Sequence, residues 1–182
     1  MLTLAVTLAA CGLVGEPATM LARIVAVESE GVSYALNVNG DYELVHPPSG
    51  PEEAVAMARW LLHHGYNFDA GLAQVNSANF ERLGLTAENA FEPCRNLRAG
   101  LQVYEECRVR AVERFGPGLA AEGAALSCYN TGTFTRGHRN GYVASVLGSG
   151  VAVPGPAWGP VGGRARRASV VLVHAKDVFE EK

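Results

Sequence analysis

The sequence has no surplus of positive charge that would attract nucleic acid or an acidic membrane surface. Its 15 Lys and Arg stand against 18 Asp and Glu, so the formal net charge is −3 and the pI is about 6.0. One basic cluster is present near the C-terminus, formed by Arg164, Arg166 and Arg167. A net charge of this sign disfavours a general polyanion-binding face, and we therefore expect no nucleic-acid partner.

The signatures of metal and cofactor enzymes are also missing. The sequence contains no C-x-x-C pair, no H-E-x-x-H motif, and neither a P-loop nor a Rossmann glycine pattern. A structural zinc site, a zinc peptidase and a nucleotide-binding fold are therefore disfavoured. His63 and His64 are adjacent in the sequence but lack the spacing of metal ligands. We expect neither a metal nor another cofactor.

The chain further lacks an apolar run long enough to cross a bilayer, because the apolar stretch over residues 1–14 is too short. The residues Leu8-Ala9-Ala10-Cys11 are similar to a lipoprotein cleavage site. However, no Lys or Arg precedes Arg23, whereas a signal segment should open with positive charge. We favour a first core helix that carries Cys11 over a lipidated or cleaved leader. On this interpretation, no export signal is evident in the sequence.

The composition that is present suits one globular domain with a short appendage. Of the 182 residues, 48% are hydrophobic and 18% are charged, which supports a packed core and argues against global disorder. From Gly148 to Gly163 the composition changes to Gly and Pro, as is typical of a linker. We expect a domain over residues 1–147, followed by a linker and C-terminal tail over 148–182. Within the tail, Val170–Val173 is β-prone.

The sequence contains four cysteines: Cys11, Cys94, Cys107 and Cys128. An even number suggests two disulfides if the protein lies outside the cytoplasm. One helix is expected over Asn96–Phe115, and its rise of about 1.5 Å per residue places Cys94 too far from Cys107 for a disulfide. A helix running back after Gly116–Gly118 would bring Cys128 close to Cys107. Cys11–Cys94 is then the second pair. The alternative is four buried free thiols.

Helical periodicity dominates the sequence, and one β-hairpin is inserted in it. Helices are expected over residues 17–30, from the Ser49-x-x-Glu52 capping box to Gly65, and over 77–83, 96–115, 120–129 and 142–147. The hairpin would pair Tyr34–Val38 with Tyr42–Val45 through an Asn39-Gly40 turn, since Asn-Gly is a strong hairpin signal. The predicted fold class is mainly α.

Glu28 lies on the apolar face of the first long helix, and Glu30 points to the opposite side. The residues that share the face of Glu28 at helical spacing are Leu21, Ile24 and Val25. A carboxyl on such a face is either paired with a cation, such as Arg98, or partly desolvated. Desolvation raises the pKa of a carboxyl, as a general acid requires near neutral pH. Helical phase alone leaves both interpretations open.

Three short motifs follow one another along the chain: VAVES at 25–29, GLAQVN at 71–76 and SCYNTG at 127–132. Together they resemble the lysozyme-like lytic transglycosylases, in particular the VirB1-type members that accompany type IV secretion and conjugation machines. The resemblance covers about residues 11–146. It implies a lysozyme-like α+β fold and a periplasmic, monomeric enzyme that acts on peptidoglycan glycan strands.

The resemblance implies a role for each motif. Glu28 is the catalytic acid and later the base. The substrate-binding residues are Ser29, Gln74, Asn76, Tyr129 and Asn130. Ser29 would lie near the sugar N-acetyl group or hold Glu28, Gln74 and Asn76 would line the sugar cleft, and Tyr129 would approach the scissile bond. Asn130 would bind sugar or hold its loop. The structural alternatives are turn-stabilising amides at 74 and 76, a core aromatic at 129 and a helix cap at 130.

The implied reaction cleaves the bond between N-acetylmuramic acid and N-acetylglucosamine with a single carboxyl, where most glycosidases use two. Glu28 protonates the bond and then takes the proton of the muramic acid C6 hydroxyl, which closes a 1,6-anhydro ring. One alternative is a hydrolytic muramidase, in which water replaces that hydroxyl. Another is a non-catalytic, peptidoglycan-binding assembly component. The tail after Gly148 motivates it, because the tail would dock type IV secretion or conjugation components.

Overall fold

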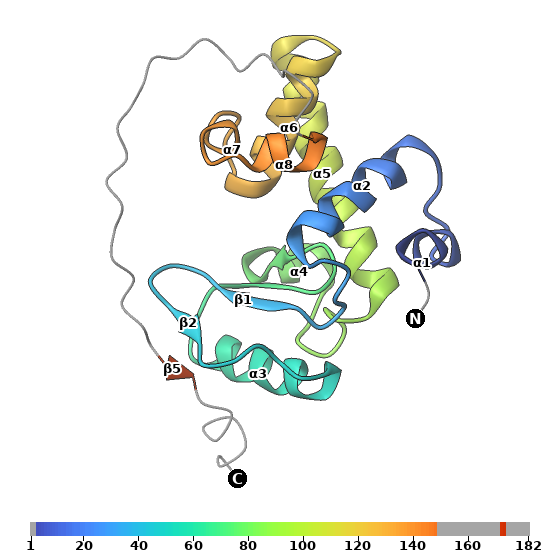
Figure 1. The fold of residues 1–182 in the computed structure, drawn as a ribbon. Helices are drawn as coiled ribbons and strands as arrows, with labels where there is room; N and C mark the ends of the chain where they lie inside the picture. Colours follow the sequence, from blue (N-terminus) through green and yellow to red (C-terminus); the bar gives the residue numbers. More distant parts are fainter. Residues whose placement is uncertain (1–2, 149–171, 174–182) are drawn as a thin grey trace. The chain divides into compact units, whose positions relative to one another are not determined.

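The computed structural model describes residues 3–148 and 172–173. The chain folds as two compact units, whose helices and strands are drawn in Figure 1. The first unit comprises residues 1–99 and 164–182, and the second comprises residues 100–163. The expected linker, the basic cluster at Arg164–Arg167 and most of the tail lie outside the described residues. Among the helices in the described part, none is both long and apolar enough to cross a bilayer.

The first unit is built mainly from helices. They are α1 (Leu4–Ala10), α2 (Gly15–Glu28), α3 (Pro51–His63), the 3-10 helix η1 (Ser77–Asn79), α4 (Phe80–Leu83) and the first residues of α5 (Pro93–Phe115). Helix α2 buries its predicted apolar face completely, since Leu21, Ile24 and Val25 are all 0% exposed. It ends two residues earlier than predicted. Glu30 and Gly31 have φ values of 53° and 82°, and such positive values are incompatible with an α-helix.

A small antiparallel sheet completes the core of the first unit. Its strands are β1 (Leu36–Val38), β3 (Phe68–Ala70) and β4 (Val75–Asn76), in the order β1-β3-β4. Leu36, Phe68 and Ala70 are buried on one face. Because side chains alternate along a strand, the other face carries Asn37, Asp69 and Asn76, which we call the polar sheet face. Mainly helical structure with a small sheet confirms the predicted fold class.

The predicted pairing of the 34–38 strand with the 42–45 strand is wrong. Strand β1 pairs with β3, and β2 (Glu43–Leu44) pairs in parallel with β5 (Leu172–Val173). The reason lies at Asn39, which the sequence analysis expected to form the turn of the hairpin with Gly40. Its backbone N–H donates to the Asn67 carbonyl at 2.8 Å, and its Nδ2 donates to Asp69 Oδ2 at 2.8 Å. Contacts with a distant strand therefore override the Asn-Gly preference.

The second unit contains the rest of α5, followed by α6 (Leu119–Thr131), α7 (Arg136–Arg139) and α8 (Tyr142–Leu147). Helix α6 has small residues along much of its length, which allows close packing. Ser127 Oγ accepts from the Gly137 N–H at 2.8 Å and donates to the Thr133 carbonyl at 2.7 Å. A Cβ at Gly137 would lie 2.6 Å from Ser127 Cα, so α7 approaches α6 at a distance that only glycine permits.

Each unit contains one disulfide. Cys11 and Cys94 are bonded in the first unit with a Cα–Cα distance of 5.1 Å, and Cys107 and Cys128 are bonded in the second at 5.7 Å. The expectation of two disulfides is confirmed, and the pairs are those that the helix geometry favoured. Cys11 follows α1 directly and is buried.

Candidate active site

Glu28 is the last residue of α2 and is half-buried at the wall of a pocket of about 300 Å³. The pocket is lined by the end of α2, the segment that leads into and includes the start of β1, and the Pro47-Pro48 segment. Arg98, the cation considered as its partner, donates from Nη2 to the Cys11 carbonyl at 2.8 Å. The sequence placed Glu28 on the apolar face of its helix, and in the structure it follows the buried residues Ile24 and Val25 by about one turn. The structure adds the pocket beside it.

Ser29 joins the end of α2 to the loop that begins at Gly71. Its side chain is buried, with 8% of the residue exposed. The Oγ lies 2.7 Å from the Leu72 carbonyl, to which it donates, and it accepts from the Gly31 N–H at 3.3 Å. A hydrogen bond across 43 residues of sequence therefore holds the residue next to Glu28. This geometry corresponds to the holding role considered for Ser29.

The loop at Gly71 is organised by Asn96, a residue that the sequence analysis did not include in the site. Asn96 is 0% exposed and makes three hydrogen bonds. Its Oδ1 accepts from the Ala73 N–H at 2.7 Å, and its Nδ2 donates to the carbonyls of Ala70 and Ala90, each at 2.8 Å. The one signal of this role in the sequence is an amide at a core position near the start of α5. A buried amide must have hydrogen-bond partners, so its presence there indicates a structural role.

Gln74 fastens the same loop to the start of β1. It has a φ of 45° and is 8% exposed. Its Nε2 donates to the carbonyls of Ala35 at 3.1 Å and Gly71 at 2.9 Å, and its Oε1 accepts from Asn37 Nδ2 at 2.7 Å. The amide group of Gln74 is engaged within the protein, and two of its partners, Ala35 and Asn37, line the Glu28 pocket.

Asn76 lies on the polar sheet face and is tied into a network of amides. Its Nδ2 donates to Asn67 Oδ1 at 2.9 Å and to Asp69 Oδ1 at 2.7 Å, and its Oδ1 accepts from the Ala78 N–H at 3.0 Å, which caps η1. Asp69 is a second carboxyl that the sequence analysis missed. Burial raises the pKa of Asp69, and its hydrogen bonds from Asn39 and Asn76 act in the opposite direction.

The two remaining predicted residues, Tyr129 and Asn130, belong to α6 in the second unit. Tyr129 is half-buried. Asn130 is exposed, and its Oδ1 accepts from Asn140 Nδ2 at 2.8 Å. Thr131 Oγ1 donates to the Ser127 carbonyl at 2.8 Å, and Gly132, which follows the last residue of α6, is in the left-handed conformation. Asn130 thus links the end of α6 to the residue that follows α7, and Thr131 bonds back to a carbonyl one turn earlier in α6.

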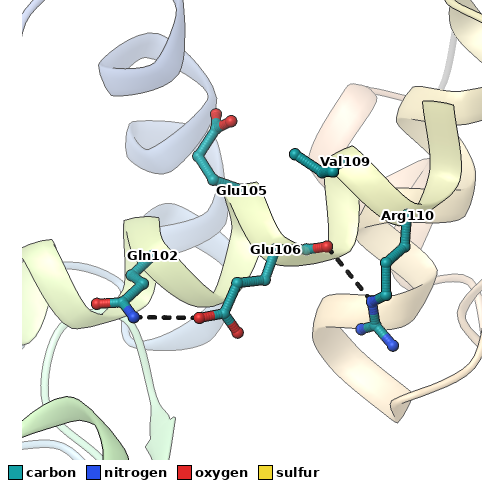
Figure 2. Close-up of a pocket in the computed structure, with 5 residues that line it drawn as sticks. All are labelled: Gln102, Glu105, Glu106, Val109 and Arg110. Carbon is teal, nitrogen blue, oxygen red and sulfur yellow. Dashed lines mark hydrogen bonds between the residues drawn. The ribbon is translucent and has the colours of Figure 1, made fainter. Parts of the chain in front are cut away.

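The second unit also carries an open groove of about 640 Å³ along α5 (Figure 2). Its lining residues are Gln102, Glu105, Glu106, Val109 and Arg110. Gln102 Nε2 donates to Glu106 Oε1 at 3.1 Å, and Arg110 Nε donates to the Glu106 carbonyl at 3.3 Å (Figure 2). Arg110 Nη2 lies 2.9 Å from Cys128 Sγ. The polar groups of the groove are largely engaged with one another, and the groove contains none of the predicted site residues.

No group of three or more His, Cys, Asp or Glu side chains that could hold a metal occurs within residues 3–148 and 172–173. His138 of α7 is half-buried. Burial lowers its pKa, a hydrogen bond with the Gly123 backbone opposes this, and its Nε2 is buried without a partner among the described residues.

Comparisons with known proteins match most of the chain. The transglycosylase SLT domain family matches residues 14–147. A type IV secretion system protein virB1 from Brucella abortus is 40% identical over 145 residues, which is 76% of this chain and 60% of that protein. A protein virB1 from Rhizobium radiobacter is 36% identical over 126 residues, 69% of this chain and 52% of that protein. The chain thus spans at most about 60% of the length of these relatives. No solved structure matches it significantly.

Proposed function

We propose, since this chain belongs to the transglycosylase SLT domain family, that it is a lytic transglycosylase that cleaves the glycan strands of peptidoglycan. The observation that carries the proposal is the position of Glu28. It is half-buried at the end of an apolar helix face and lines a pocket of about 300 Å³. The hydrogen bond from Ser29 to the Leu72 carbonyl supports it, because it holds the end of α2 against the loop that carries Gln74.

In the proposed reaction, Glu28 first acts as a general acid. It donates its proton to the oxygen that links C1 of N-acetylmuramic acid to N-acetylglucosamine, and the bond between C1 and that oxygen breaks. The N-acetyl oxygen of the muramic acid stabilises the positive charge at C1. The Glu28 carboxylate then accepts the proton of the C6 hydroxyl, whose oxygen attacks C1. The product is a 1,6-anhydro sugar, and no water is consumed.

The other predicted residues support this reaction in proposed roles. Ser29 is a positioning residue for Glu28, because its hydroxyl is engaged with the protein backbone. Gln74 and Asn76 shape the Gly71 loop and the polar sheet face through hydrogen bonds within the first unit. Tyr129 and Asn130 are proposed to contact the substrate on the strength of the sequence resemblance.

The proposed acid is tested by Glu28→Gln, which keeps the shape of the side chain but removes its proton. Removal of a general acid should lower the rate of muropeptide release from purified sacculi by at least about 100-fold. Mass spectrometry of the products identifies the 1,6-anhydro ends. Glu16→Gln is the matched control, because this carboxyl lies in the first turn of the same helix and is exposed. Wild-type rates in the Glu28→Gln protein would refute the assignment.

A hydrolytic muramidase is the second candidate, and Asp69 is the observation that favours it. Hydrolytic glycosidases use a second carboxyl to assist water or to form a covalent intermediate. Asp69 supplies such a carboxyl on the polar sheet face of the first unit. The same mass spectra separate the two reactions, because hydrolysis gives reducing ends that are heavier by one water than anhydro ends.

We further propose that residues 1–147 form the transglycosylase domain of a periplasmic monomer, and that residues 148–182 form a linker and tail that docks components of a type IV secretion or conjugation machine. The similarity to virB1 proteins supports the setting, since one of them is described as a type IV secretion system protein. A purely structural role, in which the protein binds peptidoglycan without cleaving it, predicts no muropeptide release by the wild-type chain.

A further inference from the structure

Asn37 is a pocket residue for which the motifs of the sequence assign no role. It lies in the middle of β1, between Leu36 and Val38, and faces away from the core. Its side chain is exposed and lines the same pocket as Glu28. An amide there can meet a bound molecule directly, so its orientation decides whether it offers a donor or an acceptor.

The orientation of the Asn37 amide follows from its neighbour Gln74. A carbonyl oxygen can only accept hydrogen bonds, so the atom of Gln74 that faces the carbonyls of Ala35 and Gly71 must be Nε2. The Oε1 of Gln74 is then left to accept, and the atom of Asn37 that lies 2.7 Å from it must be the donor Nδ2. Two backbone carbonyls therefore orient both amides.

The consequence is an acceptor at the pocket. One N–H of the Asn37 Nδ2 is donated to Gln74, and the side-chain Oδ1 is the acceptor of this amide. Within residues 3–148 and 172–173, Oδ1 of Asn37 accepts no hydrogen bond. Gln74 cannot rotate its amide without placing Oε1 against two carbonyl oxygens, which would cost two hydrogen bonds. The acceptor is thus preorganised before any ligand arrives.

The pocket also provides apolar surface. Val32, Pro47 and Pro48 line it together with Asn37. A group that matches both features carries an N–H donor next to a methyl group. The acetamido substituent of a 2-acetamido sugar has this chemistry, whereas a sugar hydroxyl has the donor without the methyl.

We propose that Asn37 is a specificity-determining residue, whose Oδ1 accepts the acetamido N–H of a 2-acetamido sugar in the Glu28 pocket. This inference rests on the proposed function, because it names the group of the glycan that the pocket selects. Gln74 is then a positioning residue that acts through Asn37 and does not itself contact the sugar. Its engaged amide, with three hydrogen bonds inside the protein, is thereby explained.

The test is a thermodynamic cycle between a protein side chain and a ligand group. The ligands are a chito-oligosaccharide and an analogue with N-methylated acetamido groups, which lacks the N–H but keeps the carbonyl. Binding is measured by calorimetry or NMR titration to the full chain carrying Glu28→Gln, so that no turnover occurs. Asn37→Ala should weaken binding of the first ligand about fivefold, as expected for one neutral hydrogen bond, and leave binding of the analogue unchanged.

Two further variants separate recognition from structural support. Asn37→Asp loses the donor to Gln74 but keeps an acceptor oxygen, so it should still discriminate between the two ligands. Asn67→Ala removes an exposed amide outside the pocket lining and should discriminate as the parent does. The inference is wrong if Asn37→Ala weakens both ligands equally or weakens neither. Failure of the proposed function is a separate result. In that case the wild-type protein would release no muropeptides from sacculi.

Discussion

Amide side chains determine much of the local geometry around Glu28. Asn96 is completely buried and holds the Gly71 loop through three hydrogen bonds, and Gln74 orients Asn37. Each buried amide is paired, as expected when an unpaired polar group in a core costs about 1–3 kcal/mol. Its motif marks Gln74 in the sequence but does not indicate two of its three partners, Asn37 and Ala35, because they lie 37 and 39 residues away.

Asp69 leads to a prediction at the scale of one residue. Burial raises its pKa, so the folded protein retains the Asp69 proton at a pH where the unfolded chain, with a pKa of about 3.9, has lost it. Stability should therefore fall as pH rises from about 4 through the raised pKa of Asp69. The free energy of unfolding of the wild type and of Asp69→Asn is measured by urea denaturation across this pH range. The quantity compared is the wild-type value minus the variant value.

The difference should be largest in acid, where Asp69 is protonated, and should become constant once it is ionised. Asp41→Asn, at an exposed aspartate, provides the control and should show no such trend. A difference that grows with rising pH would contradict the assignment of burial as the dominant cause. The same variant examines the muramidase candidate, because loss of Asp69 should then stop the release of hydrolytic products.

Among the structural elements, the loop from Gly71 to Gln74 joins several parts of the first unit. It connects β3 to β4, accepts the Ser29 hydroxyl and packs on Asn96 at the start of α5. A close approach of backbone to side chain makes this possible. With a φ of 76°, Gly71 would place a Cβ 2.4 Å from Asn96 Nδ2 and 2.7 Å from the Ala90 carbonyl oxygen.

Gly71→Ala should therefore destabilise the protein by roughly 2–4 kcal/mol, which combines left-handed backbone strain with overpacking. Gly84→Ala is the matched control. Its φ of 64° imposes similar strain, but a Cβ there would meet nothing within 4 Å, so the cost should be about 1–2 kcal/mol. Urea unfolding measures both values. Equal losses in the two variants would show that crowding against Asn96 contributes nothing.

At the scale of the whole molecule, the described residues and the family match nearly coincide. The match covers residues 14–147, and the described part extends over 3–148 with an additional pair at 172–173. That pair forms β5, which adds to β2 in parallel. The C-terminal region therefore contributes a strand to the first unit, although the sequence indicated only a β-prone stretch.

A chain that ends at Leu147 should still digest purified sacculi, because it keeps Glu28, the pocket and both disulfides. It should fail to restore secretion or DNA transfer in a strain that lacks the protein, since the proposed docking tail is removed. A second chain that ends at Val173 retains β5 and distinguishes this strand from residues 174–182. Full transfer activity with the Leu147 truncation would overturn the docking role.

The sequence by itself determined the long helices, the disulfide pairs and the family. Periodicity placed the long helices and the apolar face that ends at Glu28, since both depend on residues within a few turns of one another. Helix length and the turn at Gly116–Gly118 were sufficient to favour the Cys107–Cys128 pair. The three ordered motifs indicated the family.

Only the tertiary structure decided which strand pairs with β1, which atoms orient Gln74, and where the side chains of Asn37, Asp69 and Asn96 lie. The physical reason is the separation of the partners in sequence. The Ser29 bond to Leu72 spans 43 residues, and the Asn37 bond to Gln74 spans 37. A periodic pattern or a turn signal has no information about contacts at that range, because they form only when the packed core brings distant backbones together.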